Sequence, residues 1–390
     1  MSRRLIFGSL CSMVFLMNFG RVVFAALIDH FMIVFSVGSD TIGVVATLVW
    51  VGTAVPRIPT GYLLTYIPRD RMILGTAVVL AIGAGITVLS NSVVVLGVGA
   101  FVIGVAGGIY FVSANPLISD LFPGQIGRMI GIHGTASQTA SVVAPLFVAV
   151  VLIFSSWQTV FVFLSLGALA SGIIMYTISR ESSAVMSGDI VDRDFMGAIR
   201  RQWPIIMTGI GIVGATGFVW MGLFNFYVSY LTTVKLLDQA TARLLLTLIF
   251  AAGVPAFWFS GRLADSLPHI PFLFVILGSF ILGLLGLIAS EGLIQIVVIT
   301  VLLGYVIHSL FPVLDSFMLN SLPNENRASA YAVFSGGALL VEATGSSVVG
   351  TLVERGYTYD SVFTSFAVGL VIVLGILIAL YYTDRLSGVN

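Results

Sequence analysis

Residues 61–71 read Gly61-Tyr-Leu-Leu-Thr-Tyr-Ile-Pro-Arg-Asp-Arg71, and residues 261–268 read Gly261-Arg-Leu-Ala-Asp-Ser-Leu-Pro268. The glycine, the first leucine and the proline recur 200 positions apart. The same spacing relates Gly83, Gly104 and Pro123 to Gly283, Gly304 and Pro323. These matches fall between apolar runs, where glycine allows close helix contact and proline stops a helix. Two similar halves in a membrane protein indicate a site at their interface and movement of one half against the other.

The composition is that of an integral membrane protein. Of the 390 residues, 58% are hydrophobic and 9% are charged, whereas a soluble chain carries roughly 25% charged residues. The expected surroundings are therefore a lipid bilayer. The formal net charge is zero and Cys11 is the single cysteine, so neither a nucleic-acid partner nor an internal disulfide is expected.

The apolar runs predict twelve membrane-spanning helices, because about 20 apolar residues cross a bilayer core. In the first half they lie at 5–28, 41–63, 72–91, 94–117, 129–153 and 158–178. In the second half they lie at 204–231, 241–263, 270–289, 293–316, 328–352 and 361–382. The predicted domains are two six-helix bundles, 1–178 and 204–390, joined by a polar cytoplasmic linker, 179–203.

The basic residues predict the orientation, because cytoplasmic loops carry an excess of Lys and Arg. With the N-terminus inside, only Lys235, Arg243 and Arg355 lie outside. Thirteen arginines then lie at the cytoplasmic side: Arg3, Arg4, Arg57, Arg69, Arg71, Arg128, Arg180, Arg193, Arg200, Arg201, Arg262, Arg327 and Arg385. Both termini are expected in the cytoplasm, and the chain in the cytoplasmic membrane.

With these spans and motifs the chain resembles the major facilitator superfamily, whose signature between spans 2 and 3 is Gly-x-x-x-Asp-Arg-x-Gly-Arg-Arg. Thr65 stands where that family usually has Asp, while Asp265 keeps the acidic residue in the second half. The resemblance implies an all-α fold of two pseudo-symmetric six-helix bundles. It also implies transport of a small-molecule substrate by alternating access, and a monomer is expected.

The loops after spans 4 and 10 extend the resemblance. Asp120-Leu-Phe-Pro123, followed by Arg128 and Gly131, is similar to the family's acidic-x-x-Pro…Arg…Gly pattern, and Pro323 and Arg327 repeat its core. An Asp at a helix end that pairs with an Arg of a neighbouring helix can hold a gate shut. The predicted gate residues are Gly61, Arg69, Arg71, Asp120, Arg128, Gly261, Asp265 and Arg327. An alternative interpretation gives Arg69 and Arg71 a role in topology alone.

Arg21 is the cation inside the first span. Its planar guanidinium suits a carboxylate or phosphate, and Asn18-Phe-Gly-Arg21 loosely resembles the Asn-Tyr-x-Asp-Arg of the family's organic-anion symporters. We therefore expect Arg21 and Asn18 to bind an anion; the alternative is a structural ion pair of Arg21 with Glu342 or a bond to a carbonyl. Asn115, Asn225 and His308 complete the predicted substrate site.

Glu342, near the middle of span 11, is the predicted proton carrier, because a desolvated carboxyl can exchange a proton near neutral pH. A static partner for Arg21 is the rival interpretation. His308 and Asp315 in span 10 are further predicted proton-coupling residues. His308 could equally be a packing residue, and Asp315 could equally be a gate residue.

The absent motifs narrow the function further. The sequence contains no phosphate-binding loop, no metal-ligand pattern and no protease constellation, so an ATP-driven pump is disfavoured and no cofactor or metal is expected. The prediction is a secondary transporter of a small solute, an organic anion, coupled to protons, and not an enzyme. The alternative is a proton-coupled drug or metabolite efflux antiporter; more remote alternatives are a membrane-embedded enzyme and a transporter-like receptor.

Overall fold

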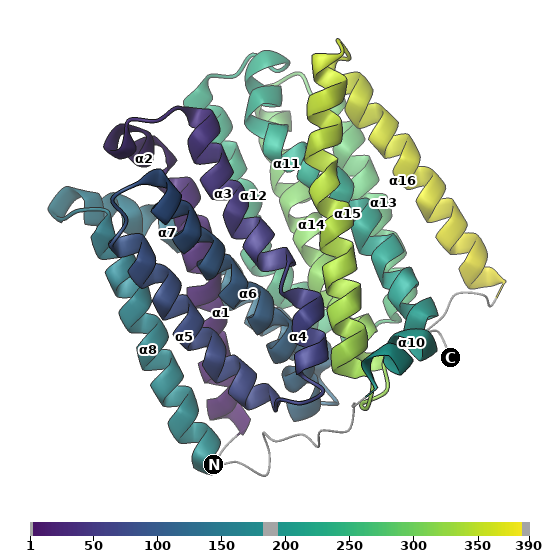
Figure 1. Cartoon of the computed structure of the whole chain (residues 1–390). Helices are drawn as coiled ribbons and strands as arrows, with labels where there is room; N and C mark the ends of the chain where they lie inside the picture. Colours follow the sequence, from purple (N-terminus) through teal and green to yellow (C-terminus); the bar gives the residue numbers. More distant parts are fainter. Residues whose placement is uncertain (1–2, 182–193, 384–390) are drawn as a thin grey trace. The chain divides into compact units, whose positions relative to one another are not determined.

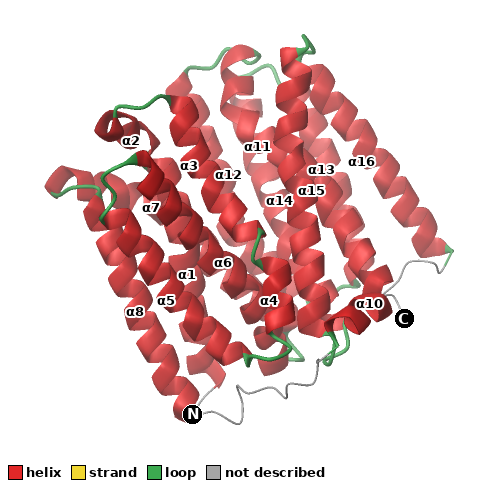
Figure 2. Cartoon of the chain, in the orientation of Figure 1, coloured by secondary structure: helices red, strands yellow, loops and turns green. Residues whose placement is uncertain are grey.

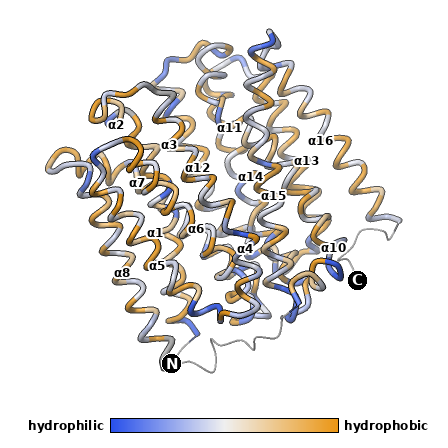
Figure 3. The backbone as a smooth tube through the Cα atoms, in the orientation of Figure 1, coloured by the Kyte–Doolittle hydropathy of each residue, from blue (hydrophilic) through white to orange (hydrophobic). Residues whose placement is uncertain are grey.

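The computed structural model describes residues 3–181 and 194–383, which are helical apart from short connections (Figures 1 and 2). Within these ranges twelve helices are long and apolar enough to cross a membrane. This confirms the predicted all-α fold with twelve spans. Apolar residues run along the helices, while hydrophilic residues collect mainly near the helix ends (Figure 3). That distribution is expected where helix sides face lipid or one another and helix ends face water.

The first half contains six spans and one short connecting helix. α2 (Ile28–Phe35) joins the first span to the second, and the second span is interrupted at Val55 and Pro56. The spans are α1 (Arg3–Ala26), α3 with α4 (Ser39–Ala54 and Arg57–Leu63), α5 (Arg69–Val88), α6 (Val93–Leu121), α7 (Ile126–Phe154) and α8 (Gln158–Glu181).

The second half also contains six spans. The first is a continuous helical run of 39 residues made of α10 (Phe195–Gly209), a π-helical turn η1 (Ile210–Gly214) and α11 (Ala215–Thr233). The others are α12 (Gln239–Ala264), α13 (His269–Ala289), α14 (Leu293–Ser321), α15 (Arg327–Glu354) and α16 (Tyr359–Tyr382).

Helix α10 begins earlier than the span predicted at 204–231. Asp194 caps it, since Asp194 Oδ1 accepts a hydrogen bond of 2.8 Å from the Gly197 N–H, as Asp does at helix N-termini. Hydropathy marks the apolar part of a helix and not its polar first turns. The start of α10 therefore occupies part of the predicted linker, whose residues 182–193 lie outside the described ranges.

The chain divides into two compact units. Unit 1 comprises residues 1–123, 136–201 and 324–333, and unit 2 comprises residues 124–135, 202–323 and 334–390. Helix α7 thus begins in unit 2 and continues in unit 1, while α15 begins in unit 1 and continues in unit 2. The predicted domain boundaries, 1–178 and 204–390, stay a prediction.

Glycines of the sequence repeat occupy equivalent packing positions in the two units. A Cβ on Gly83 would lie 2.9 Å from Ile103, and one on Gly283 would lie 2.7 Å from Leu303. A Cβ on Gly104 would overlap the Val49 carbonyl oxygen, and one on Gly304 would lie 2.6 Å from that of Ile249. Each neighbour pair is again 200 positions apart, so the repeat in the sequence is a repeat in helix packing.

Local capping explains where several helices begin. Ser92, Asp238 and Thr358 each accept a hydrogen bond from the backbone N–H three residues later, at the starts of α6, α12 and α16. Pro68 and Pro268 occupy the same place before α5 and α13, where a fixed φ and a missing N–H are tolerated. The repeated prolines therefore mark corresponding helix starts in the two halves.

Candidate functional site

Arg21 is held by Asn18, one turn earlier on α1. Arg21 Nη2 donates a hydrogen bond of 2.6 Å to Asn18 Oδ1. The Asn18 amide nitrogen donates to α7, to the Ser137 carbonyl oxygen at 2.6 Å and to Ser141 Oγ at 2.7 Å. Because both amide hydrogens are used on α7, the amide oxygen is free to accept from Arg21. The structure therefore brings these two predicted binding residues together, with α7 fixing their orientation.

Two aromatic rings flank the Arg21 guanidinium. Its central carbon lies 5.2 Å from the ring centroid of Trp50 on α3 and 5.2 Å from that of Phe111 on α6, within the range of cation–π attraction. Arg21 Nε is buried and has no hydrogen-bond partner. In the described part of unit 1, no carboxylate forms an ion pair with Arg21. The group can thus accept an anion.

The other two predicted binding asparagines belong to different units. In unit 1, Asn115 of α6 is buried, and its Nδ2 donates a hydrogen bond of 2.7 Å to the Tyr331 hydroxyl on α15. In unit 2, exposed Asn225 of α11 donates to the Met221 carbonyl oxygen at 3.1 Å and to Ser346 Oγ at 2.6 Å. Both contacts hold helices together, and substrate binding by either residue stays a prediction.

His308 of α14 is enclosed by aromatic rings. The ring centroids of Trp220, Phe250, Phe257 and Phe311 lie 5.9, 5.8, 6.3 and 6.4 Å from that of His308. Nδ1 lies 2.7 Å from the Gly304 carbonyl oxygen. A carbonyl only accepts, so Nδ1 carries a proton and Nε2 is the acceptor when the ring is neutral. This arrangement fixes the ring and leaves one nitrogen for another partner.

Glu342 of α15 is buried against the backbone of α11. A Cβ on Gly217 would overlap Cγ of Glu342 and lie 2.9 Å from its Oε1. Glu342 is 6% exposed, so the carboxyl occupies space that only a glycine at 217 leaves open. Asp315, half-buried on α14, belongs to the same unit. The proton-coupling roles of Glu342, His308 and Asp315 stay predictions.

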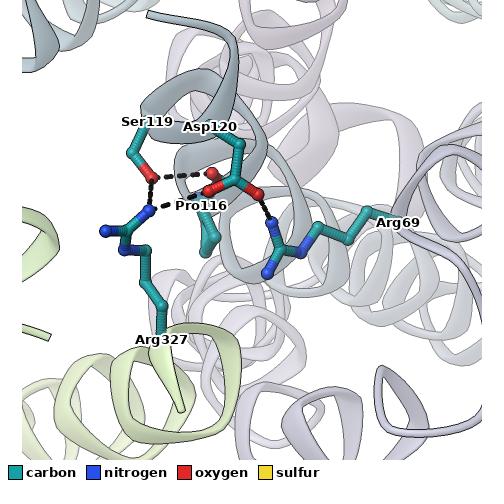
Figure 4. A network of polar contacts seen from close by, with 5 residues as sticks. All are labelled: Arg69, Pro116, Ser119, Asp120 and Arg327. Atoms are coloured by element: carbon teal, nitrogen blue, oxygen red, sulfur yellow. Dashed lines mark hydrogen bonds and ion pairs between the residues drawn. The ribbon is translucent and has the colours of Figure 1, made fainter. Parts of the chain in front are cut away.

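Asp120, at the end of α6, joins two arginines in unit 1 (Figure 4). Its carboxylate accepts from Arg69 Nη1, at the start of α5, and from Arg327 Nη1 at 2.8 Å, at the start of α15. Arg327 Nη1 also donates to Ser119 Oγ at 3.2 Å, and Ser119 Oγ donates to the Pro116 carbonyl oxygen at 2.7 Å. Three predicted gate residues thus form one network between the two halves of the sequence.

An apolar cluster adjoins this network in sequence. Ala328, which follows Arg327, packs in a buried cluster with Leu64, Met72, Val112 and Ala332. The side chains of Arg327 and Arg69 are 10% and 17% exposed. The Asp120 side chain is 34% exposed, so water screens the charges of this network in part, although less than it screens a fully exposed ion pair.

Asp265, after the end of α12, caps the start of α7 in unit 2. Its Oδ1 accepts from the Gly127 N–H at 2.7 Å and its Oδ2 accepts from the Arg128 N–H at 2.9 Å. A carboxylate here satisfies unpaired N–H groups and opposes the positive end of the helix dipole. The Arg128 side chain donates to Gln125 at 3.3 Å, so this arginine contributes mainly its backbone.

Gly261 and Gly61 permit the corresponding backbone approaches. A Cβ on Gly261 would lie 2.6 Å from Cα of Gly131 on α7. A Cβ on Gly61 would overlap the Cβ of Ala332 on α15. The two predicted gate glycines therefore pack against the starts of α7 and α15, one in each unit.

The two halves differ at the acidic position of the signature. Thr65 is buried, and its hydroxyl donates to the Tyr62 carbonyl oxygen at 2.7 Å within its own helix turn. Asp120 supplies the carboxylate that contacts α15 instead. Arg71 is exposed, and no ion pair in the described ranges includes it. The gate roles of all eight residues stay predictions.

The sequence did not single out several residues that the structure adds to these sites. Trp50 and Phe111 cover Arg21, Ser119 joins the Asp120 network, and Gly217 makes room for Glu342. With 28 phenylalanines and 42 glycines in the chain, residue type alone carries no signal. Only their distances from charged residues in space reveal them.

The family model of the Major Facilitator Superfamily matches residues 10–307 of the chain. The chain belongs to this superfamily. It is therefore a multi-pass membrane transporter and not an enzyme. No curated protein matches it significantly in sequence.

Solved structures of superfamily transporters share its fold. The proton:xylose symporter XylE, bound to 6-bromo-6-deoxy-D-glucose, superimposes with a TM-score of 0.80 at 12% identity, over 98% of this chain and 96% of that one. The human organic anion transporter MFSD10 (TETRAN) gives 0.80 at 12% identity, over 97% and 100%. The Escherichia coli fucose:proton symporter FucP gives 0.70 at 15%, over 97% and 98%. At these identities the likeness shows the fold.

Proposed function

We propose that this superfamily member moves a small organic anion across the cytoplasmic membrane by alternating access, coupled to protons. The observation that carries the proposal concerns Arg21. Its guanidinium lies near two aromatic rings, and its Nε is buried without a hydrogen-bond partner. A charge within a membrane costs about 2.5–3.5 kcal/mol on insertion scales. In the described ranges no carboxylate forms an ion pair with Arg21, so a bound anion would offset this cost. The likeness to an organic anion transporter accords with this class of solute.

Glu342 is the proposed proton carrier. Its carboxyl is almost fully buried in the α11–α15 contact, and desolvation favours the neutral form of a carboxyl. A group that alternates between such surroundings and water can take up a proton on one side and release it on the other. The likeness to two proton symporters accords with this coupling.

The gate contacts are proposed to open and close in each cycle. Helices α7 and α15 each begin among residues of the opposite half of the sequence. Movement of one six-helix half against the other must then break the bonds of Asp120 and Asp265. Both termini are proposed to lie in the cytoplasm, on the side of these contacts, as the arginine distribution predicts.

Transport by reconstituted protein tests the proposal. Proteoliposomes are given radiolabelled organic anions with and without an imposed pH gradient. Uptake of an anion by wild type, increased by the gradient and abolished in Arg21→Ala, is the expected result. Glu342→Gln is expected to retain exchange of labelled for unlabelled anion and to lose pH-driven accumulation. Full pH-driven accumulation by Glu342→Gln removes Glu342 from the mechanism, and Arg21-independent efflux of amphipathic cations favours an exporter instead.

A further inference from the structure

Most hydrogen-bond donors of Arg21 have no acceptor among the described residues. A guanidinium carries five N–H groups, and the described contacts of Arg21 use one of them, in the bond from Nη2 to Asn18. The buried Nε has no partner. A carboxylate accepts on two oxygens and matches the planar fork of a guanidinium. The remaining donors therefore suit the carboxylate of an organic acid.

The rings of Trp50 on α3 and Phe111 on α6 surround the place where such an acid binds. A charged pair of this kind has N–O distances of about 2.7–2.9 Å, so the carbon that follows the carboxyl group lies about 5 Å from the guanidinium carbon. Both ring centroids lie 5.2 Å from that same carbon. The surroundings of an acid bound to Arg21 therefore include these two rings.

Close packing of α3 against α6 fixes the two rings. A Cβ on Gly104 would overlap the carbonyl oxygen of Val49, the residue before Trp50. A Cβ on Gly108, three residues before Phe111, would overlap another carbonyl oxygen of α3. The helices approach closely because these positions are glycine. Rings held in this way lose little freedom when a ligand binds between them.

Both rings remain accessible. Trp50 is 43% exposed, and Arg21 and Phe111 are partly exposed. Aromatic rings stabilise a second aromatic ring by offset-stacked or edge-to-face contact, beyond the area that is buried. A saturated ring of the same size gains only the burial. The site therefore favours an acid whose carboxylate is attached to a planar aromatic ring.

The second half of the chain carries an aromatic pair at the equivalent positions. Phe250 and Phe311 stand 200 residues after the two rings of unit 1, and both are partly exposed. In unit 2 their centroids lie 5.8 and 6.4 Å from that of His308, another polar side chain. The glycines and prolines of the repeat serve helix packing and helix starts, whereas partly exposed rings beside a polar group are not required for either. The repeated pair thus points to ligand binding.

We propose that Trp50 and Phe111 form a ring-binding subsite beside Arg21, and that the transported solute is an aromatic carboxylate. This inference rests on the proposed transport of an organic anion and names its class. Arg21 binds the carboxylate, and Trp50 and Phe111 bind the ring. Saturated acids and small acids without a ring are bound more weakly.

Isothermal titration of the purified full-length protein tests this. Benzoate is compared with cyclohexanecarboxylate, which has the same charge and number of carbons, and with acetate, which has no ring. Wild type is expected to bind benzoate about tenfold more tightly than cyclohexanecarboxylate, a difference of about 1.4 kcal/mol, and acetate most weakly. Trp50→Leu is expected to abolish this preference and retain cyclohexanecarboxylate binding, while Trp50→Phe keeps the preference. The control is Phe154→Leu, at an 84% exposed aromatic position of unit 1, which is expected to bind as wild type does.

The possible results separate the ring assignment from the proposed function. Failure of wild type to bind benzoate, or equal affinity for benzoate and cyclohexanecarboxylate, overturns the ring assignment. A preference for benzoate that survives in both Trp50→Leu and Phe111→Leu also overturns it, and leaves anion transport through Arg21 intact. Equal weakening of all three acids in Trp50→Leu overturns it as well, because Trp50 would then support Arg21 and not the ring of the solute. Unchanged binding of every acid in Arg21→Ala overturns the proposed function itself.

Discussion

Arg21 shows how a permanently charged side chain is kept inside a span. Its guanidinium donates a hydrogen bond to an amide oxygen and lies near two aromatic rings. Each of these contacts stabilises a cation without neutralising it. A carboxylate partner would have cancelled the charge and occupied the edge of the guanidinium at which the proposed anion would bind. The contacts thus orient the guanidinium while its charge stays available to a ligand.

Asn18→Ala tests this at the level of one residue. The substitution removes the acceptor of Arg21 Nη2 and both bonds to α7, and a hydrogen bond to a charged group contributes about 1.5–3 kcal/mol. We expect anion affinity to fall about tenfold or more, measured by isothermal titration against the solute that wild type binds. Ser12→Ala, on an exposed part of the same helix, is expected to leave affinity unchanged. Wild-type affinity in Asn18→Ala would show that α7 does not position Arg21.

The sequence could predict Arg21, Glu342 and His308 as candidates because an ionisable group within an apolar run is costly wherever it lies. It could not predict their surroundings. Trp50 and Gly217 lie on other spans, far along the chain, and neither type is unusual in a membrane helix. The sequence therefore identifies the charged residue of each contact, whereas its uncharged partners are identified only from the structure.

At the scale of elements, α11 and α15 pack through small residues at several levels. Gly217 faces Glu342, a Cβ on Gly222 would lie 2.8 Å from Val349, and one on Gly345 would overlap the Phe218 carbonyl oxygen. The π-helical turn η1 directly precedes α11, and such turns are frequent at functional sites. A close helix contact with a carboxyl inside it leaves no room for even one additional methyl group.

Gly217→Ala is therefore expected to displace the Glu342 carboxyl. We expect loss of pH-driven accumulation with exchange retained, and a loss of about 1–3 kcal/mol in stability from overpacking. Glu342→Asp in the same protein shortens the side chain by one methylene and is expected to restore part of the pH response. Transport and thermal unfolding measure both effects. Gly369→Ala on α16, where a Cβ meets nothing within 4 Å, is the control; failure of Glu342→Asp to rescue would separate Gly217 from Glu342.

The helices themselves were largely predictable. Hydropathy located all twelve spans, since each must supply an apolar stretch long enough for the bilayer. The start of α10 at Phe195 was missed, because its signal is the Asp194 cap and not hydrophobicity. The 200-residue repeat predicted equivalent packing, and the matched neighbours of Gly83 and Gly283 have that spacing. The length of an apolar run and a repeat in the sequence thus predict spans and their packing, whereas a helix start that depends on a single capping residue is not marked by hydropathy.

At the scale of the whole molecule, two ties of different chemistry connect the halves of the sequence. In unit 1 a carboxylate binds two arginine side chains, Arg69 and Arg327. In unit 2 a carboxylate binds the backbone N–H groups of Gly127 and Arg128. Charge pairs weaken in salt, whereas capping bonds depend on the helix end itself. The two halves are thus similar in sequence, but the contacts of Asp120 and Asp265 differ in chemistry. A separate substitution can therefore weaken each of these two ties.

Asp120→Asn tests whether the unit 1 tie limits opening. Asn keeps the size of the side chain and loses the charge that both arginines share. Because Asp120 is 34% exposed, we expect a loss of only about 1–2 kcal/mol, a shift of about tenfold toward states in which the start of α15 is released. Ser329, buried at that helix start, reports this: as Ser329→Cys in a Cys11→Ser background, its maleimide labelling is expected to accelerate about tenfold.

The matched control is Asp194→Asn, which weakens an ion pair with Arg201 in the same unit whose side chains are 64% and 53% exposed. Solvent and salt already screen that pair, so its loss is expected to leave Ser329→Cys labelling at the wild-type rate. High salt should accelerate labelling in the wild-type background and have little effect in Asp120→Asn, where the charged tie is gone. Equal labelling of wild type and Asp120→Asn at low salt would mean that Asp120 does not hold the start of α15, and the capping contact of Asp265 would then be the tie that limits opening.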